Sequence, residues 1–102
     1  MASGTLGQAA LAAITNTTVY TAATTPTTFN VSFTNTSGFP IAVRLAISDA
    51  ATPVAAEYVE YDTVIPGNGV LERGGLVCTA GKLIVAYASQ AGVSVNVYGY
   101  EG

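Results

Sequence analysis

Residues 29–48 read FNVSFTNTSGFPIAVRLAIS, and this stretch decides the fold class. Apolar side chains alternate with polar or small ones on both sides of the turn-forming cluster Asn35-Thr36-Ser37-Gly38. A period of two places one side of a strand against a core and the other side towards solvent. We therefore expect two half-buried strands, at residues 29–34 and 41–48, joined as a hairpin. Pro40 begins the second strand, where its missing amide hydrogen does least harm.

Similar patterns continue along the rest of the chain. Pro66-Gly67-Asn68-Gly69 is the strongest turn signal, because Asn and Gly accept positive φ. We expect Gly74-Gly75 to break the strand that begins at Val70, and residues 9–14 to form either a strand or one helical turn. The remaining expected strands lie at residues 16–21, 57–65, 76–78, 83–88 and 93–100.

These patterns predict an all-β fold, a single antiparallel β-sandwich of about eight short strands with a jelly-roll or an Ig-like topology. No segment with a helical period is long enough for a crossover between parallel strands. We expect residues 1–102 to form this one domain, with residues 1–8 as an extended N-terminal arm that orders on contact with a neighbour.

Charge is scarce throughout the chain. Only 9% of the residues are charged, against about a quarter in an ordinary soluble domain, while 50% are hydrophobic. The net charge is −3, and the three basic residues are scattered, so we predict no nucleic-acid binding. No apolar stretch is long enough to span a membrane as a helix. Such a chain is expected to cover much of its surface with other protein chains, as part of an assembly.

Residues suited to catalysis are few. The chain has no histidine, and its one cysteine, Cys78, lies in the apolar run Gly75-Leu76-Val77-Cys78, which indicates a buried structural thiol. In the expected strand, Glu60 and Asp62 share one face and Glu57 faces the other way. A carboxylate pair of this kind suits a hard cation or acid–base chemistry, but the spacing matches no calcium loop. We predict no enzyme activity, no cofactor and no metal site, and expect the acids to pair with basic residues on a strand surface.

Tyrosines form the second candidate set. Those at positions 58, 61, 87, 98 and 100 lie in expected strands, where they suit protein interfaces or, less well, sugar stacking. Tyr98 and Tyr100 share one strand face, opposite Val93, Val95 and Val97, so they point outward if the valines face the core. The predicted interface residues are Arg44, Tyr58, Glu60, Asp62, Arg73, Tyr98 and Tyr100.

Several segments resemble a known group of proteins. Four segments are similar to small virion structural proteins of tailed phages, notably cyanophages and marine phages. They are the opening MASGTLGQAALAAITNTTVYT, then TFNVSFTNTSGFPIAVRLAIS, then AAEYVEYDTVIPGNGVLERGGLVCTAGKLIVAYAS, and the closing VSVNVYGYEG. The resemblance covers nearly the whole chain, and its best markers lie at residues 57–62, 65–73 and 97–99. These markers are structural, so the resemblance carries over no active site.

The resemblance implies a β-sandwich module located in the virion and assembled in the host cytoplasm. The function that it implies is capsid decoration, in which the protein stabilises the shell by non-covalent contacts. The alternative is a component of the tail, baseplate or fibre that binds a receptor or glycan. The partners would be the major capsid protein or other virion proteins, together with further copies of the chain in a homo-oligomer such as a trimer.

Overall fold

The computed structural model describes residues 3–22 and 26–101, and this part of the chain is almost entirely β-structure. Its eight strands lie in two four-stranded antiparallel sheets. The strands are β1 (Ser3–Leu11), β2 (Thr17–Thr21), β3 (Thr27–Asn35), β4 (Ile41–Ser48), β5 (Tyr58–Ile65), β6 (Val70–Cys78), β7 (Leu83–Ala88) and β8 (Val93–Glu101). One turn of 3-10 helix, η1 (Ala55–Glu57), directly precedes β5.

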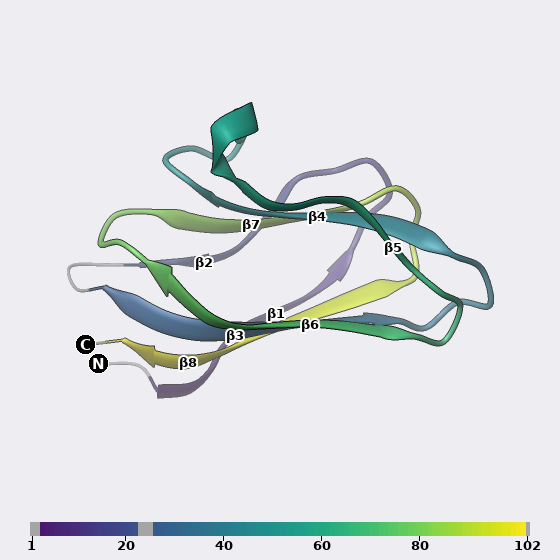
Figure 1. The fold of residues 1–102 in the computed structure, drawn as a ribbon, viewed down its shortest axis with the longest axis horizontal. Coiled ribbons are helices and arrows are strands. Elements are labelled where there is room, and N and C mark those ends of the chain that lie inside the picture. The colour runs from purple at the N-terminus through teal and green to yellow at the C-terminus, as the bar shows by residue number, and fades with distance from the viewer. Residues whose placement is uncertain (1–2, 23–25, 102) are drawn as a thin grey trace.

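The strand order identifies the sandwich as a jelly roll. One sheet has the order β1-β8-β3-β6 and the other the order β2-β7-β4-β5. Strand β4 pairs with β5, β3 with β6, β2 with β7 and β1 with β8, so each antiparallel pair encloses the previous one along the chain. Successive pairs lie in alternate sheets, which form the two layers (Figure 1). An Ig-like sandwich would instead place its first two strands side by side in one sheet. The predicted antiparallel sandwich of about eight strands is confirmed, and its topology is now resolved.

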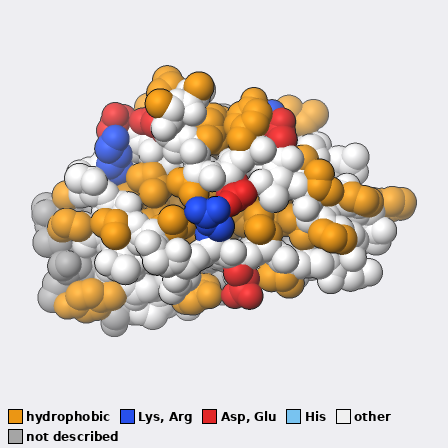
Figure 2. Space-filling model, in the orientation of Figure 1, with side chains coloured by type: hydrophobic (Ala, Val, Ile, Leu, Met, Phe, Trp, Pro, Cys, Tyr) orange, Lys and Arg blue, Asp and Glu red, His pale blue; other side chains and the backbone are white. Residues whose placement is uncertain are grey.

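Charged side chains are sparse on the surface of this sandwich. Figure 2 shows them as small separate groups among hydrophobic and uncharged polar side chains on one face of the molecule. This distribution follows directly from the composition, in which 9% of residues are charged.

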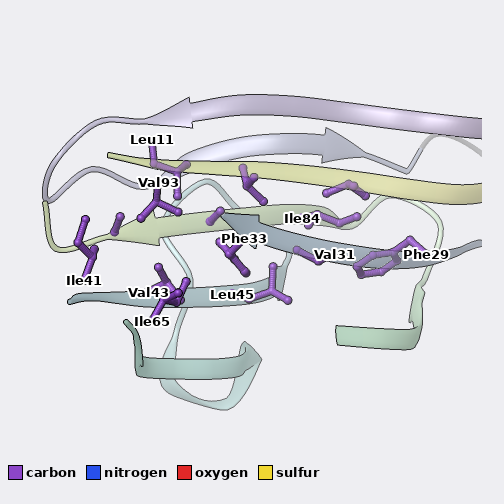
Figure 3. Close-up of a cluster of buried hydrophobic side chains, with 14 of the residues drawn as sticks. Leu11, Phe29, Val31, Phe33, Ile41, Val43, Leu45, Ile65, Ile84 and Val93 are labelled. Atoms are coloured by element: carbon purple, nitrogen blue, oxygen red, sulfur yellow. The ribbon is translucent and has the colours of Figure 1, made fainter. Parts of the chain in front are cut away.

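The core lies between the two sheets and is built from alternate residues of the central strands. Phe29, Val31 and Phe33 of β3 have no exposed surface, as expected from their alternation with polar residues. Val43 and Leu45 of β4 face them from the other sheet, together with Ile84 of β7 (Figure 3). Burying a side chain of this size stabilises the fold by about 1.5–3 kcal/mol, so this pattern largely determines which side of each strand faces the core.

The expected hairpin between β3 and β4 is wrong, because the two strands lie in different sheets. The alternation shows which side of each strand is buried, but it does not show which strand is the hydrogen-bonded neighbour. After β3 the chain crosses between the layers, and the side chain of Asn35 fixes the crossing. Its Nδ2 atom donates to the carbonyl oxygens of Phe39 (2.6 Å) and Ile65 (3.1 Å).

The expected break at Gly74-Gly75 is also wrong, since β6 continues through both residues. The register with β3 shifts at this point, where Phe29 pairs with Leu76 and Val31 pairs with Arg73. Gly75 has a φ of 68°, a conformation that glycine adopts without strain. The glycines therefore form a bulge inside one strand and do not separate two strands.

The N-terminal segment belongs to the sandwich from residue 3 onward. Strand β1 pairs antiparallel with β8, from Ser3 opposite Tyr100 to Leu11 opposite Val93. The expected arm at residues 1–8 thus coincides in part with β1, and residues 1–2 lie outside the described residues. Of the two alternatives for residues 9–14, the strand is correct for residues 9–11.

Candidate interaction surface

A bulge in β5 shapes the outer face of the β2-β7-β4-β5 sheet. Thr63 pairs with Val43 and Glu60 pairs with Leu45, so Tyr61 and Asp62 together lie opposite the single residue Arg44. Asp62 adopts the left-handed conformation, with a φ of 53°. Such a conformation is uncommon outside glycine, although Asp and Asn tolerate it better than most residues.

The bulge overturns the expected pairing of two carboxylates. Glu60 lies opposite Leu45, which is fully buried, and so faces the inner side of the sheet. Asp62 instead reaches Arg44 on the outer side. The prediction that Glu60 and Asp62 share a face is wrong, because the extra residue reverses the alternation between them. The two carboxylates therefore do not form one site.

Arg44 lies at the centre of a cluster on this outer face. Its Nε atom donates to Oδ1 of Asp62 at 2.6 Å, and its Nη2 atom donates to Oδ2 at 3.3 Å. The guanidinium carbon lies 4.2 Å from the ring centroid of Tyr61 and 4.4 Å from that of Tyr87. Hydrogen bonding to Asp62 raises the pKa of Arg44. The cluster combines a two-pronged ion pair with cation–π contacts, which together restrict the arginine strongly.

Tyr58 extends the cluster towards an open hollow. Its ring centroid lies 4.9 Å from that of Tyr61, with an angle of 79° between the ring planes. This edge-to-face arrangement is a favourable one for aromatic pairs. Pro53 and Ala55 complete the lining of the hollow from the segment before β5. The η1 turn lies outside β4 in Figure 1, so this segment stands above the sheet.

Glu57 holds that segment in place. Its carboxylate accepts hydrogen bonds from the backbone amides of Val54 and Asp49, each at 3.0 Å, and from Oγ of Ser48 at 3.1 Å. The two backbone hydrogen bonds, from Val54 and then from Asp49, lower the pKa of Glu57. Glu57 therefore fixes the segment that lines the hollow.

Glu60 and Arg73 form a separate ion pair at one edge of the sandwich. They come from β5 and β6, the edge strands of the two different sheets. Oγ1 of Thr63 also donates to Oε1 of Glu60 at 2.6 Å. The pair links the two layers where no backbone hydrogen bonds join them, which indicates a structural role.

Tyr98 and Tyr100 lie on β8, in the sheet opposite the Arg44 cluster. The two residues are 37% and 52% exposed, while Val95 and Val97 are fully buried. The outward orientation expected from alternation is therefore confirmed. The predicted interface residues thus divide among three places, namely the Arg44 cluster, the Glu60–Arg73 edge and the outer face of β8.

Sequence reasoning missed the central position of Tyr61 and Tyr87 and the contribution of Pro53 and Ala55. Both tyrosines belonged to the candidate set, but no signal in the sequence placed them around Arg44. The bulge that does so depends on the register between β4 and β5, and local periodicity carries no information on that register.

The described residues contain no group of three His, Cys, Asp or Glu side chains that could hold a metal ion. In the same part of the chain, no helix is long and apolar enough to cross a membrane. Cys78 is buried, and desolvation raises the pKa of its thiol. The chain shows no significant match to a protein-family model, to a curated protein sequence or to a solved structure.

Proposed function

We propose that the chain is a structural protein of a phage virion, most simply a capsid decoration protein that stabilises the shell by non-covalent contacts. The sequence resemblance supports this proposal, and the distribution of charge is the structural observation that carries it. Each of the three basic side chains is paired with an acid of the same chain. The pairs are Arg44–Asp62, Arg73–Glu60 and Lys82–Asp49.

Large apolar and aromatic side chains are exposed on both sheets and in the loops of the sandwich. They are Ile14, Phe39, Val54, Tyr61, Val64, Val70, Val77, Tyr98 and Tyr100. Figure 2 shows hydrophobic side chains distributed over much of the visible face. Contact with other protein surfaces is favourable for a surface of this kind, because the hydrophobic effect scales with the apolar area removed from water.

The area required is modest for a chain of this size. A standard interface buries about 800 Å² on each partner, which is roughly one sixth of the 4,933 Å² accessible surface of this chain. One face of the sandwich supplies that area and leaves the rest of the surface for further contacts. The partners in this proposal are the major capsid protein and further copies of the chain, for example in a trimer at a local symmetry axis.

A component of the tail, baseplate or fibre is the second candidate. The Arg44 cluster favours it, because exposed tyrosines beside a hollow suit recognition of a ligand outside the particle better than burial against a shell. Both candidates act through contact and include no chemical step.

Quantitative mass spectrometry of purified particles from the phage that encodes the chain tests the proposal. A decoration protein should be present at a copy number close to that of the major capsid protein. Its selective removal should lower the temperature at which the heads release their DNA. A copy number that matches the low symmetry of the tail would support the second candidate. Absence from purified particles would contradict both.

A further inference from the structure

The ring of Tyr61 is a pre-ordered and accessible platform. Tyr61 is 58% exposed although Arg44 lies over its ring and Tyr58 contacts it. Arg44 is itself held by Asp62 and Tyr87. Since these contacts already restrict the ring in the free protein, a ligand that stacks on it loses little affinity to side-chain ordering.

The surroundings of Tyr61 form a concave surface. Tyr58 and Tyr61 rise from β5, and Pro53 and Ala55 face the same hollow from the segment that Glu57 fixes. Aromatic rings and small apolar side chains therefore meet in the hollow. The carboxylate of Asp62 lies beside it, because Asp62 pairs with the Arg44 guanidinium that lies over the Tyr61 ring. Small-molecule sites commonly combine an apolar lining with a few polar groups that orient the ligand.

The charges beside the hollow favour a neutral ligand with hydroxyl groups. The positive charge of Arg44 is balanced by Asp62, whose side chain is 48% exposed. A carboxylate offers about four acceptor sites, and Arg44 occupies one on each oxygen. Acceptor capacity therefore remains for hydroxyl donors. An anionic ligand would be repelled by the carboxylates of Asp62 and Glu57, because the nearest guanidinium, that of Arg44, already pairs with Asp62.

A proline-rich peptide fits this surface less well. Peptides in the polyproline conformation dock into grooves lined by aromatic side chains. Here the rings of Tyr58 and Tyr61 touch each other at 4.9 Å between centroids, so they leave no slot between them. A flat ligand with one apolar face matches a single exposed ring better.

We propose that this hollow binds a neutral hexopyranose unit of a glycan. The C–H groups on one face of the sugar pack against the face of the Tyr61 ring that Arg44 does not cover, because they are slightly positive and the ring face is slightly negative. The hydroxyl groups at the sugar margin donate to the carboxylate of Asp62. Tyr61 and Asp62 are therefore the binding residues, and Arg44 is a positioning residue that orients both.

The test is a titration of the isolated, ¹⁵N-labelled chain with methyl β-galactopyranoside and methyl β-glucopyranoside, followed by amide chemical shifts. We expect saturable shifts at residues 53–62, with a dissociation constant on the order of 1 mM because one sugar ring covers little area. Sialic acid, an anionic sugar, should cause no such shifts. The absence of shifts with either neutral sugar would overturn the proposal.

Variants separate stacking on Tyr61 from non-specific binding. Tyr61→Phe should retain binding within about threefold, whereas Tyr61→Ala should weaken it at least tenfold, which is about 1.4 kcal/mol. Ala55→Leu fills the hollow from outside the sheet and should also abolish binding, which keeps the test valid if Tyr61→Ala fails to fold. Tyr98→Ala, on the opposite sheet, is the matched control and should change nothing.

Two further outcomes would contradict the proposal. One is binding that persists in both Tyr61→Ala and Ala55→Leu. The other is saturable binding of an oligoproline peptide at residues 53–62 when the sugars do not bind, which would assign the hollow to a peptide. Because the isolated chain is used, the result is independent of whether the protein is found in the head, in the tail or outside the virion.

Discussion

The loops at one end of the sandwich carry no charged residue, whereas the described loops at the other end carry Asp49, Glu57 and Lys82. The uncharged end comprises residues 12–16, 36–40, 66–69 and 89–92, and we call it the Asn35 end. The opposite end comprises residues 49–57 and 79–82, and we call it the Glu57 end. Figure 1 shows loops 36–40 and 66–69 on the right and the Glu57 end on the left.

The two ends illustrate two ways of organising loops. At the Asn35 end the fully buried side-chain amide of Asn35 donates to three carbonyl oxygens and accepts a hydrogen bond from the backbone amide of Ser37. At the Glu57 end the carboxylate of Glu57 accepts hydrogen bonds from two backbone amides, and the ion pair between Lys82 and Asp49 lies near it on the surface. Buried neutral hydrogen bonds do not change with pH or salt, whereas exposed charged groups respond to both. We therefore expect the Asn35 end to keep its structure when pH and salt change, and the structure of the Glu57 end to respond to both.

Asn35→Ala tests the first half of this comparison and should have the largest effect. The substitution leaves buried carbonyl groups near Phe39 and Ile65 without their donor, which costs about 2–4 kcal/mol of unfolding free energy. Urea unfolding at pH 5 and pH 7 should show the same loss, since an amide does not titrate. Gln90→Ala, an exposed change at the same end, is the control. A loss below about 0.5 kcal/mol would show that Asn35 does not organise this end.

Glu57→Gln tests the second half and should have a local, pH-dependent effect. The pKa of Glu57 is lowered in the folded protein, so its stabilising contribution is present above the ordinary pKa of 4.5 and is lost as pH falls through the folded value. In the wild type, hydrogen-exchange protection of the amides of Val54 and Asp49 should therefore fall below that pH. In Glu57→Gln it should already be lower at pH 7 and change little on acidification.

The Asn35 end is the control for this second experiment. Amide protection at residues 36–40 should stay the same in the wild type and in Glu57→Gln over the same pH range. If protection fell equally at both ends, acidification would act on the whole fold, and the distinction between the two ends would be lost.

The two ends also differ in how far the sequence predicts them. Alternation identified the inward side of β3, β4 and β8 correctly, because burial of Phe33, Val43 or Val95 requires nothing beyond the period of a strand. It gave no information on which strands pair, so the β3–β4 hairpin was wrong. The crossing at Asn35 depends on carbonyl groups 30 residues away in sequence, and local patterns do not report such contacts.

The candidate site was predicted in composition but not in geometry. Arg44, Tyr58 and Asp62 were named from residue type and strand position, and they do lie in one cluster. The partnership of Tyr61 with Arg44 arises from the bulge at Asp62, and that bulge reversed the expected relation of Glu60 to Asp62. Aspartate in a left-handed conformation has no sequence signature as clear as that of Gly75.

Lys82→Ala should have a smaller effect than either substitution above. Lys82 Nζ lies 3.0 Å from Oδ1 of Asp49, whose side chain is 75% exposed. Exposed ion pairs of this kind contribute little, because water and salt screen them. We expect the midpoint of urea unfolding to stay unchanged at high salt and nearly unchanged at low salt. A clear loss that persists at high salt would mean that the Glu57 end depends on this pair.

The smallest expected effect concerns Cys78, which reports on opening of the Glu57 end. Its thiol is fully buried and its Sγ lies 3.5 Å from the carbonyl oxygen of Lys82. Burial raises the pKa of the thiol, and the thiolate is the reactive form, so a thiol reagent should react only when this region opens. Because the ion pair contributes little, Lys82→Ala should leave the reaction rate of Cys78 unchanged. A faster reaction, with the global unfolding midpoint unchanged, would show that the surface charges keep the end of β6 closed. The region that responds to pH and salt would then extend from the loops of the Glu57 end into the sandwich.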